Sequence, residues 1–159
     1  MSDVVVVDAS LALKWILAEL DSSKAVMLLE QWTNEGISVI APALFTYEVT
    51  NTLHRQVVAG KLTYEEAKQG LNDLFSIGVL LKFSIHEEIS AQAMEFAHQL
   101  NLPATYDAHY LALAFHENCE YWTADTRLWN IVKGKLNWVR WFSDYRPWQD
   151  KTSESSEVS

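Results

Sequence analysis

The sequence contains little cysteine, proline or glycine, and it has no long apolar run. Cys119 is the single cysteine, so an internal disulfide and a cysteine-ligated zinc cluster are both excluded. No apolar stretch approaches the about 20 residues that cross a bilayer, and the first residues lack the basic start of a signal peptide. The five glycines are scattered, so there is no glycine-rich phosphate loop. We therefore expect a cytoplasmic protein without a membrane-spanning segment.

Basic residues are also scarce. Lys and Arg together number 12 against 21 Asp and Glu, which gives a formal net charge of −9. Nucleic-acid backbones are bound mainly by Lys and Arg. The charge balance therefore argues against a nucleic-acid partner, unless the negative charge is concentrated where cations bind. The five histidines form no H-E-x-x-H pattern of a zinc site.

Short apolar and β-branched runs alternate with helical patterns along the chain. The expected strands cover residues 4–7, 37–41, 79–83, 120–123 and, as an edge strand, 138–141. We expect Pro42 to open a helix that Gly60 stops, and Thr63 to cap the next helix, which ends near Gly78. The alternation predicts an α/β fold with a central, mainly parallel sheet of about four to five strands flanked by helices.

The length of the chain suits one domain with a substantial core. We expect this domain to cover residues 1–142, followed by a C-terminal extension over residues 143–159. The end of the extension, residues 151–159, is rich in serine and lacks aromatic residues, which predicts disorder there.

Four acidic residues stand near positions where a parallel sheet usually binds its ligands. Asp8 and Asp125 lie just beyond the first and fourth strands, whose carboxyl ends should lie side by side. Asp107 begins a helix after a loop, and each of these aspartates has N-capping as its alternative role. Glu48 lies inside a helix among apolar or uncharged neighbours, with no Lys or Arg within one turn. Its carboxylate therefore needs a cation, or else it snorkels to solvent or marks a hinge.

Clustered carboxylates indicate a particular chemistry. Hard divalent cations such as Mg²⁺ and Mn²⁺ prefer oxygen ligands, and carboxylates repel one another until such a cation arrives. A cation held in this way lowers the pKa of a bound water, orients a scissile phosphate and stabilises the leaving oxygen. A site of this kind needs neither a covalent nucleophile nor a catalytic histidine.

Four segments resemble, in order and in spacing, the motifs of PIN-domain ribonucleases, and within that family the VapC toxins of bacterial and archaeal toxin–antitoxin pairs. The segments are Val5–Ser10, Pro42–Leu53, Asp107–Ala112 and Thr123–Asp125. The resemblance extends over roughly residues 4–141. It implies an endoribonuclease that depends on Mg²⁺ or Mn²⁺.

The resemblance also implies a role for each matching residue. The catalytic and metal-binding positions fall on Asp8, Glu48, Asp107 and Asp125. Asp8 and Asp107 match the principal metal ligands, and the other two acids complete the site directly or through waters. Ser10 and Thr123 match hydroxyl positions that support the carboxylates, with local capping as the alternative. Asn51 is expected to orient the glutamate from the next helical turn, or else to face solvent.

The partners implied by the resemblance are an RNA substrate, an antitoxin protein and a second copy of the chain in a homodimer. Lys14, Arg55 and Arg127 lie near the motifs and are candidates for contacts with the RNA backbone, or else ordinary surface charges. Two other functions stay open: a solitary PIN-domain nuclease in RNA processing, and a catalytically inactive PIN-like binding module. A receiver domain would need an aspartate where Ser84 follows the third strand, and a haloacid dehalogenase-type phosphatase would need one in place of Ser10.

Overall fold

The computed structural model describes residues 2–147, and the predicted disordered end of the chain lies outside this range. Its centre is a sheet of five parallel strands in the order β3-β2-β1-β4-β5. The strands are β1 (Val4–Val7), β2 (Ser38–Pro42), β3 (Leu80–Lys82), β4 (Tyr121–Thr123) and β5 (Val139–Trp141). This arrangement confirms the predicted α/β fold, including the position of the last strand at an edge.

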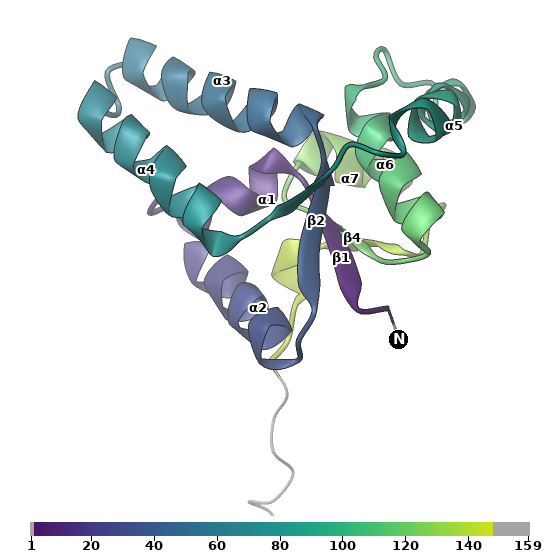
Figure 1. The fold of residues 1–159 in the computed structure, drawn as a ribbon, viewed down its shortest axis with the longest axis horizontal. Coiled ribbons are helices and arrows are strands. Elements are labelled where there is room, and N and C mark those ends of the chain that lie inside the picture. Colours follow the sequence, from purple (N-terminus) through teal and green to yellow (C-terminus); the bar gives the residue numbers. More distant parts are fainter. Residues whose placement is uncertain (1, 148–159) are drawn as a thin grey trace, which may run out of the picture.

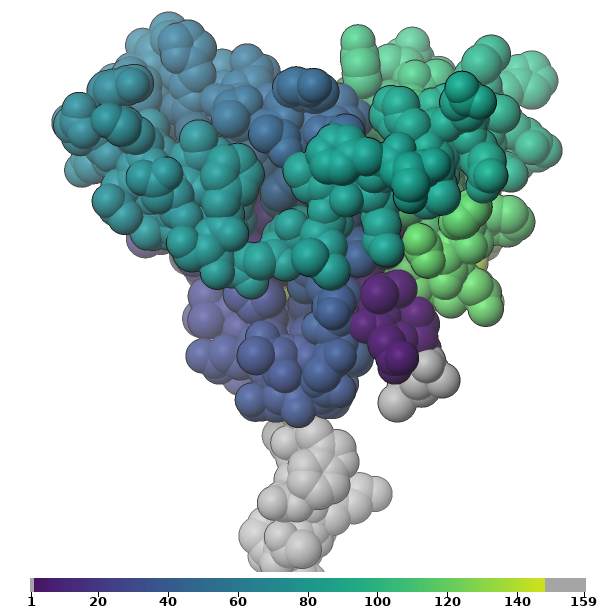
Figure 2. Space-filling model, in the orientation of Figure 1, coloured from purple at the N-terminus to yellow at the C-terminus, as the bar shows by residue number. Residues whose placement is uncertain are grey.

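Helices connect the strands and surround the sheet (Figure 1). They are α1 (Ala9–Leu13), α2 (Ser22–Asn34), α3 (Leu44–Val58), α4 (Tyr64–Ile77), α5 (His86–Gln99), α6 (Tyr106–Glu117) and α7 (Thr126–Val132), with a 3₁₀ turn at Phe142–Asp144. Helices α3 and α4 pack as one pair, and α5 and α6 pack as another. In the view of Figure 2 the two pairs form separate lobes, joined across the visible face by the segment that carries β3. Among residues 2–147, no helix is long and apolar enough to cross a membrane.

The core covers both faces of the central strands, and α6 contributes a continuous buried run to it. Val5, Val6 and Val7 of β1 are buried on both faces of the sheet, as their β-branched run predicts. Helix α6 contacts β1, β2 and β4, and its run Tyr110–Ala114 is fully buried. Burial of one such large apolar side chain contributes about 1.5–3 kcal/mol relative to exposure. The buried sheet and α6 therefore form the scaffold for the residues that lie at the ends of these elements.

The helix ends follow local chemistry. Thr63 caps α4 in a capping box with Glu66, and Gly78 ends the helix with a φ of 90°, as the sequence predicts. The prediction that Pro42 opens the third helix is wrong. Pro42 is the last residue of β2, in register with Lys82, and the helix begins at Leu44. A proline has no N–H to donate, so β2 loses one ladder donor at this position, which is its last residue.

The strand order creates a crevice at the carboxyl ends of the strands. The chain leaves β1 toward β2 on one side and later returns to β4 on the other side of β1. The loops that follow β1 and β4 therefore diverge at the carboxyl ends of the strands, where open α/β sheets bind ligands. This topology brings residues 8 and 125 to the same end of the sheet.

Candidate active site

Asp8 is the most deeply held acid of the group. It caps α1 by accepting from the Leu11 N–H (3.1 Å), and it is buried. Ser10 Oγ donates to Oδ1 (2.5 Å), while Tyr121 Oη donates to Oδ2 (2.7 Å) and the Thr123 hydroxyl donates to the same oxygen. Burial raises the pKa of Asp8, and these four hydrogen bonds oppose the rise. The carboxylate is thus fixed in place by neutral donors.

The two predicted supporting hydroxyls connect the ends of β1 and β4. Ser10 Oγ accepts from the Ala124 N–H (3.1 Å) while it donates to Asp8. Thr123 Oγ1 accepts from the Asp125 N–H (3.0 Å) while it also donates to Asp8. Each hydroxyl therefore joins Asp8 to the loop that carries Asp125.

Asp125 is the N-cap of α7. Its Oδ1 accepts from the backbone N–H groups of Arg127 (2.9 Å) and Leu128 (3.1 Å). The capping alternative raised from the sequence is thus real for Asp125, as it is for Asp8. Capping and ligation are compatible here, because the capping bonds of Asp125 use only Oδ1 and a carboxylate has two oxygens.

Asp107 differs from the other two aspartates because it is not an N-cap. The N-cap position of α6 is Thr105, and Asp107 lies in the first turn. Its Oδ2 accepts from Nη2 of Arg127 at 3.3 Å. Burial is the main cause that raises the pKa of Asp107; repulsion by Asp125 and Asp8 adds to the rise, and Arg127 opposes it.

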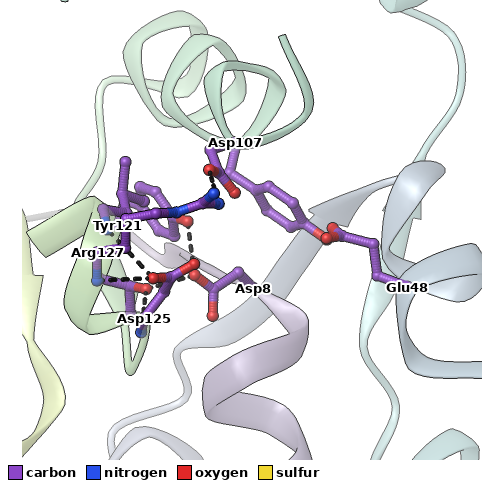
Figure 3. Close-up of polar contacts among 9 residues, drawn as sticks. Asp8, Glu48, Asp107, Tyr121, Asp125 and Arg127 are labelled. Atoms are coloured by element: carbon purple, nitrogen blue, oxygen red, sulfur yellow. Dashed lines mark hydrogen bonds and ion pairs between the residues drawn. The ribbon is translucent and has the colours of Figure 1, made fainter. Parts of the chain in front are cut away.

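Glu48 reaches the group from α3, on the opposite side from Asp125 and Arg127 (Figure 3). Its Oε1 accepts a 2.5 Å hydrogen bond from the Tyr110 hydroxyl. Burial, followed by repulsion from the three aspartates, raises the pKa of Glu48 to about 7, although the Tyr110 bond lowers it. A carboxyl group in this state changes its charge near neutral pH.

Two buried tyrosines were missed by sequence reasoning. The rings of Tyr110 and Tyr121 stack with centroids 5.8 Å apart, and their hydroxyls end on Glu48 and Asp8 respectively. The sequence contains one indication of their role: Tyr110 lies three residues after Asp107, and residues at this spacing are neighbours on a helix surface. Their pKa values are raised mainly by burial, so both phenols stay protonated and act as donors.

A pocket of about 430 Å³ opens beside the acids, between α3 and the start of α6. It is lined by Leu44, Tyr47, Glu48, Asn51, Pro103, Ala104, Tyr106, Asp107 and Arg127. Asn51 thus stands beside Glu48, but the hydrogen bond to Glu48 comes from Tyr110.

Of the three basic residues expected near the motifs, Arg127 lines this pocket. Lys14 instead forms an ion pair with Glu19 (2.8 Å), and its ammonium lies 5.1 Å from the centre of the Phe142 ring. Arg55 is exposed on α3. Arg127 is therefore the best placed of the three to contact a ligand in the pocket.

The donor set suits a hard divalent cation. Asp8, Glu48, Asp107 and Asp125 supply only carboxylate oxygens. Burial raises the pKa of the first three, and repulsion between the acids adds to the rise for Glu48 and Asp107. A bound cation would relieve this cost. Among residues 2–147, no three acidic, histidine or cysteine side chains converge as ligands of one ion in this conformation. Ligation would therefore need side-chain movement, such as release of Asp107 by Arg127.

The sequence is similar to a known protein family, and the fold is similar to that of a solved structure. A profile of the PIN domain family matches residues 5–134. No curated protein matches the sequence. Among solved structures, the crystal structure of PAE2754 from Pyrobaculum aerophilum is similar, with a TM-score of 0.63 and 18% identity over 91% of this chain and 94% of that chain. At this identity the similarity supports the fold alone.

Proposed function

Because the chain belongs to the PIN domain family, a family of nucleases, we propose that it is an endoribonuclease dependent on Mg²⁺ or Mn²⁺. The observation that carries the proposal is the electrostatic coupling of four carboxylates from separate elements, two of which, Glu48 and Asp107, line one pocket. Burial and repulsion raise the pKa of Glu48 to about 7, with contributions from all three aspartates. Such an arrangement is costly for stability alone and suits a bound cation.

The residues of the site would have two roles, cation binding and orientation of the carboxylates. Asp8, Glu48, Asp107 and Asp125 would hold the cation, which when bound supplies an acidified water and charge stabilisation for phosphodiester hydrolysis. The hydroxyls around Asp8 fix its orientation, and Tyr110 fixes that of Glu48. These donors keep the carboxylate oxygens in place before the substrate arrives.

Arg127 supplies the positive charge of the site. Its side chain is 70% exposed and reaches Asp107 at 3.3 Å from within the pocket lining. A planar guanidinium binds a phosphate as readily as a carboxylate. Arg127 would therefore exchange its bond to Asp107 for a bond to the RNA phosphate, which frees the aspartate for the cation.

Cleavage of a panel of transfer and ribosomal RNAs tests the proposal. Wild-type protein should cleave at least one RNA with Mg²⁺ or Mn²⁺ and none with EDTA. The Asp107→Asn variant should be inactive, whereas Asp73→Asn, a change of an aspartate on α4 outside the site, should be fully active. Metal-independent cleavage, or full activity of Asp107→Asn, would show that these acids are not the catalytic centre.

We propose further that the enzyme is the toxin of a toxin–antitoxin pair and acts as a homodimer. The support is the resemblance of its motifs to VapC toxins and the negative charge of the pocket. An arginine of an antitoxin would bind these carboxylates in the way that Arg127 already binds Asp107. It would then compete with Mg²⁺ for the same oxygens.

Gene neighbourhood and inhibition assays test this second proposal. A small partner encoded beside this chain should inhibit cleavage, and inhibition should weaken as Mg²⁺ rises. A monovalent salt at equal ionic strength is the control for screening. Inhibition that is indifferent to Mg²⁺ would contradict the competition mechanism, and the absence of any partner would favour a solitary nuclease in RNA processing.

A further inference from the structure

Two exposed tyrosines line the pocket from opposite walls. Tyr47 lies on α3 and is 70% exposed, and Tyr106 opens α6 and is 63% exposed. Each directly precedes an acid of the site, Glu48 and Asp107 respectively. The pocket therefore has one aromatic ring beside an acidic side chain on each wall.

Neither ring belongs to the buried core of residues 2–147. In that range, no hydrogen bond involves either hydroxyl, and neither ring packs against another aromatic ring. Tyr110 and Tyr121 show the contrast, because they are buried, stacked on each other and bonded to carboxylates. Exposed aromatic surface gathered at a pocket indicates a ligand-binding role.

The charge of the pocket indicates which kind of contact a nucleic acid would need. Arg127 is the only Lys or Arg among its described lining residues, against Glu48 and Asp107, and the whole chain carries −9. Phosphate contacts can therefore supply only a small share of the affinity. Stacking of a base on an aromatic ring does not need positive charge, and every base has a π-face.

We propose that Tyr47 and Tyr106 form a base-binding subsite that holds an unpaired base of single-stranded RNA next to the acidic centre. The inference rests on the proposed nuclease function and assigns a ligand contact to two residues outside the four acids. The pocket volume of about 430 Å³ lies within the range of small-ligand pockets. Bases within a duplex are stacked on their neighbours, so duplex RNA would not offer a free base to these rings.

Binding of fluorescein-labelled RNA, measured by fluorescence anisotropy, tests the subsite separately from cleavage. Ca²⁺ replaces Mg²⁺ in the buffer, and gels verify that the RNA stays intact. Tyr47→Ala and Tyr106→Ala should each weaken binding of a single strand about 5- to 150-fold, the usual range for loss of one stacked base. The corresponding Phe variants should bind like wild type, because they keep the ring.

The matched control is Tyr64→Ala. Tyr64 is 65% exposed on α4, outside the pocket, so its loss should leave binding unchanged. Salt dependence gives an independent readout. The slope of log affinity against log salt should stay the same in the Tyr47 and Tyr106 variants, whereas Arg127→Gln should reduce it by about 0.7.

The outcomes separate this inference from the nuclease proposal. Unchanged RNA binding by both Ala variants would overturn the subsite, even if wild type cleaves RNA. Equal binding of duplex and single strand by wild type would overturn the preference for an unpaired base. Weakened binding by the Ala variants without any cleavage by wild type would support the subsite and refute the nuclease. Absence of RNA binding would overturn both.

Discussion

The raised pKa of Glu48 predicts that the metal-free protein loses stability as pH rises. In the fold this pKa is about 7, against 4.5 for an ordinary glutamate. The folded state therefore holds a proton that the unfolded state has already released over this window. The contribution of Glu48 to the free energy of unfolding is fully present below about pH 4.5. It falls between about pH 4.5 and 7 and stays low at higher pH. Substitution Glu48→Gln removes this titration while it keeps the size of the side chain and an acceptor for Tyr110.

The expected magnitude follows from the two pKa values. Their difference corresponds to at most about 3 kcal/mol at pH 8. Solvent enters the pocket beside Glu48 and screens its charge, so we expect about half of that, about 1.5 kcal/mol. Glu48→Gln should thus be more stable than wild type at pH 8, with a melting temperature about 3–6 °C higher. At pH 5 the two proteins should differ by less than about 0.5 kcal/mol.

Urea unfolding in EDTA at pH 5 and pH 8 measures this difference. Glu30→Gln is the matched control, because Glu30 is an exposed glutamate within α2, and this change should leave the pH dependence of wild type intact. A Glu48→Gln protein that is less stable than wild type at pH 8 would refute the reasoning. So would a stability gap between the two that does not change with pH.

Three further changes test the supports of the site. Asp107→Asn should abolish cleavage and leave the metal-free melting temperature equal or higher, because it removes a charge that Asp125 and Asp8 repel; a lower melting temperature would contradict this. The hydrogen bond from Tyr110 lowers the pKa of Glu48, so its removal in Tyr110→Phe should raise this pKa and move the pH-dependent loss of stability to higher pH. An unchanged transition in the same urea assay would contradict this. Thr123→Val should cost about 1–3 kcal/mol in urea unfolding, because a buried carboxylate loses a donor, and Thr123→Ser should recover most of the loss.

The order of strands and helices could be predicted from the sequence because periodicity and caps are local signals. The buried valines of β1 and the capping box at Thr63 are recognisable within a few residues of chain. Pro42 was misplaced because proline is compatible with both a strand end and a helix start, and pairing with β3 decides between them.

The acids of the candidate site could be named from the sequence, but their partners could not. Asp8 and Asp125 lie just beyond the carboxyl ends of two parallel strands, which implies that these residues lie at the same end of the sheet. The contact of Tyr110 with Glu48 joins residues 62 positions apart, and that of Tyr121 with Asp8 joins residues 113 apart. Such contacts depend on how α3, α6 and β4 pack in three dimensions, which periodicity alone does not specify.

Calorimetric titration with Mn²⁺ at pH 6.5, where Glu48 is mostly protonated, tests the central claim, that the four acids form a cation site, most directly. Wild type should bind at least one Mn²⁺ and release protons, because Glu48 has a pKa of about 7 and must be deprotonated to ligate. The measured heat should therefore vary with the ionisation heat of the buffer. Asp107→Asn should weaken binding about tenfold or more, and Asp73→Asn should bind like wild type. Absence of Mn²⁺ binding, or equal binding by Asp107→Asn, would contradict the account.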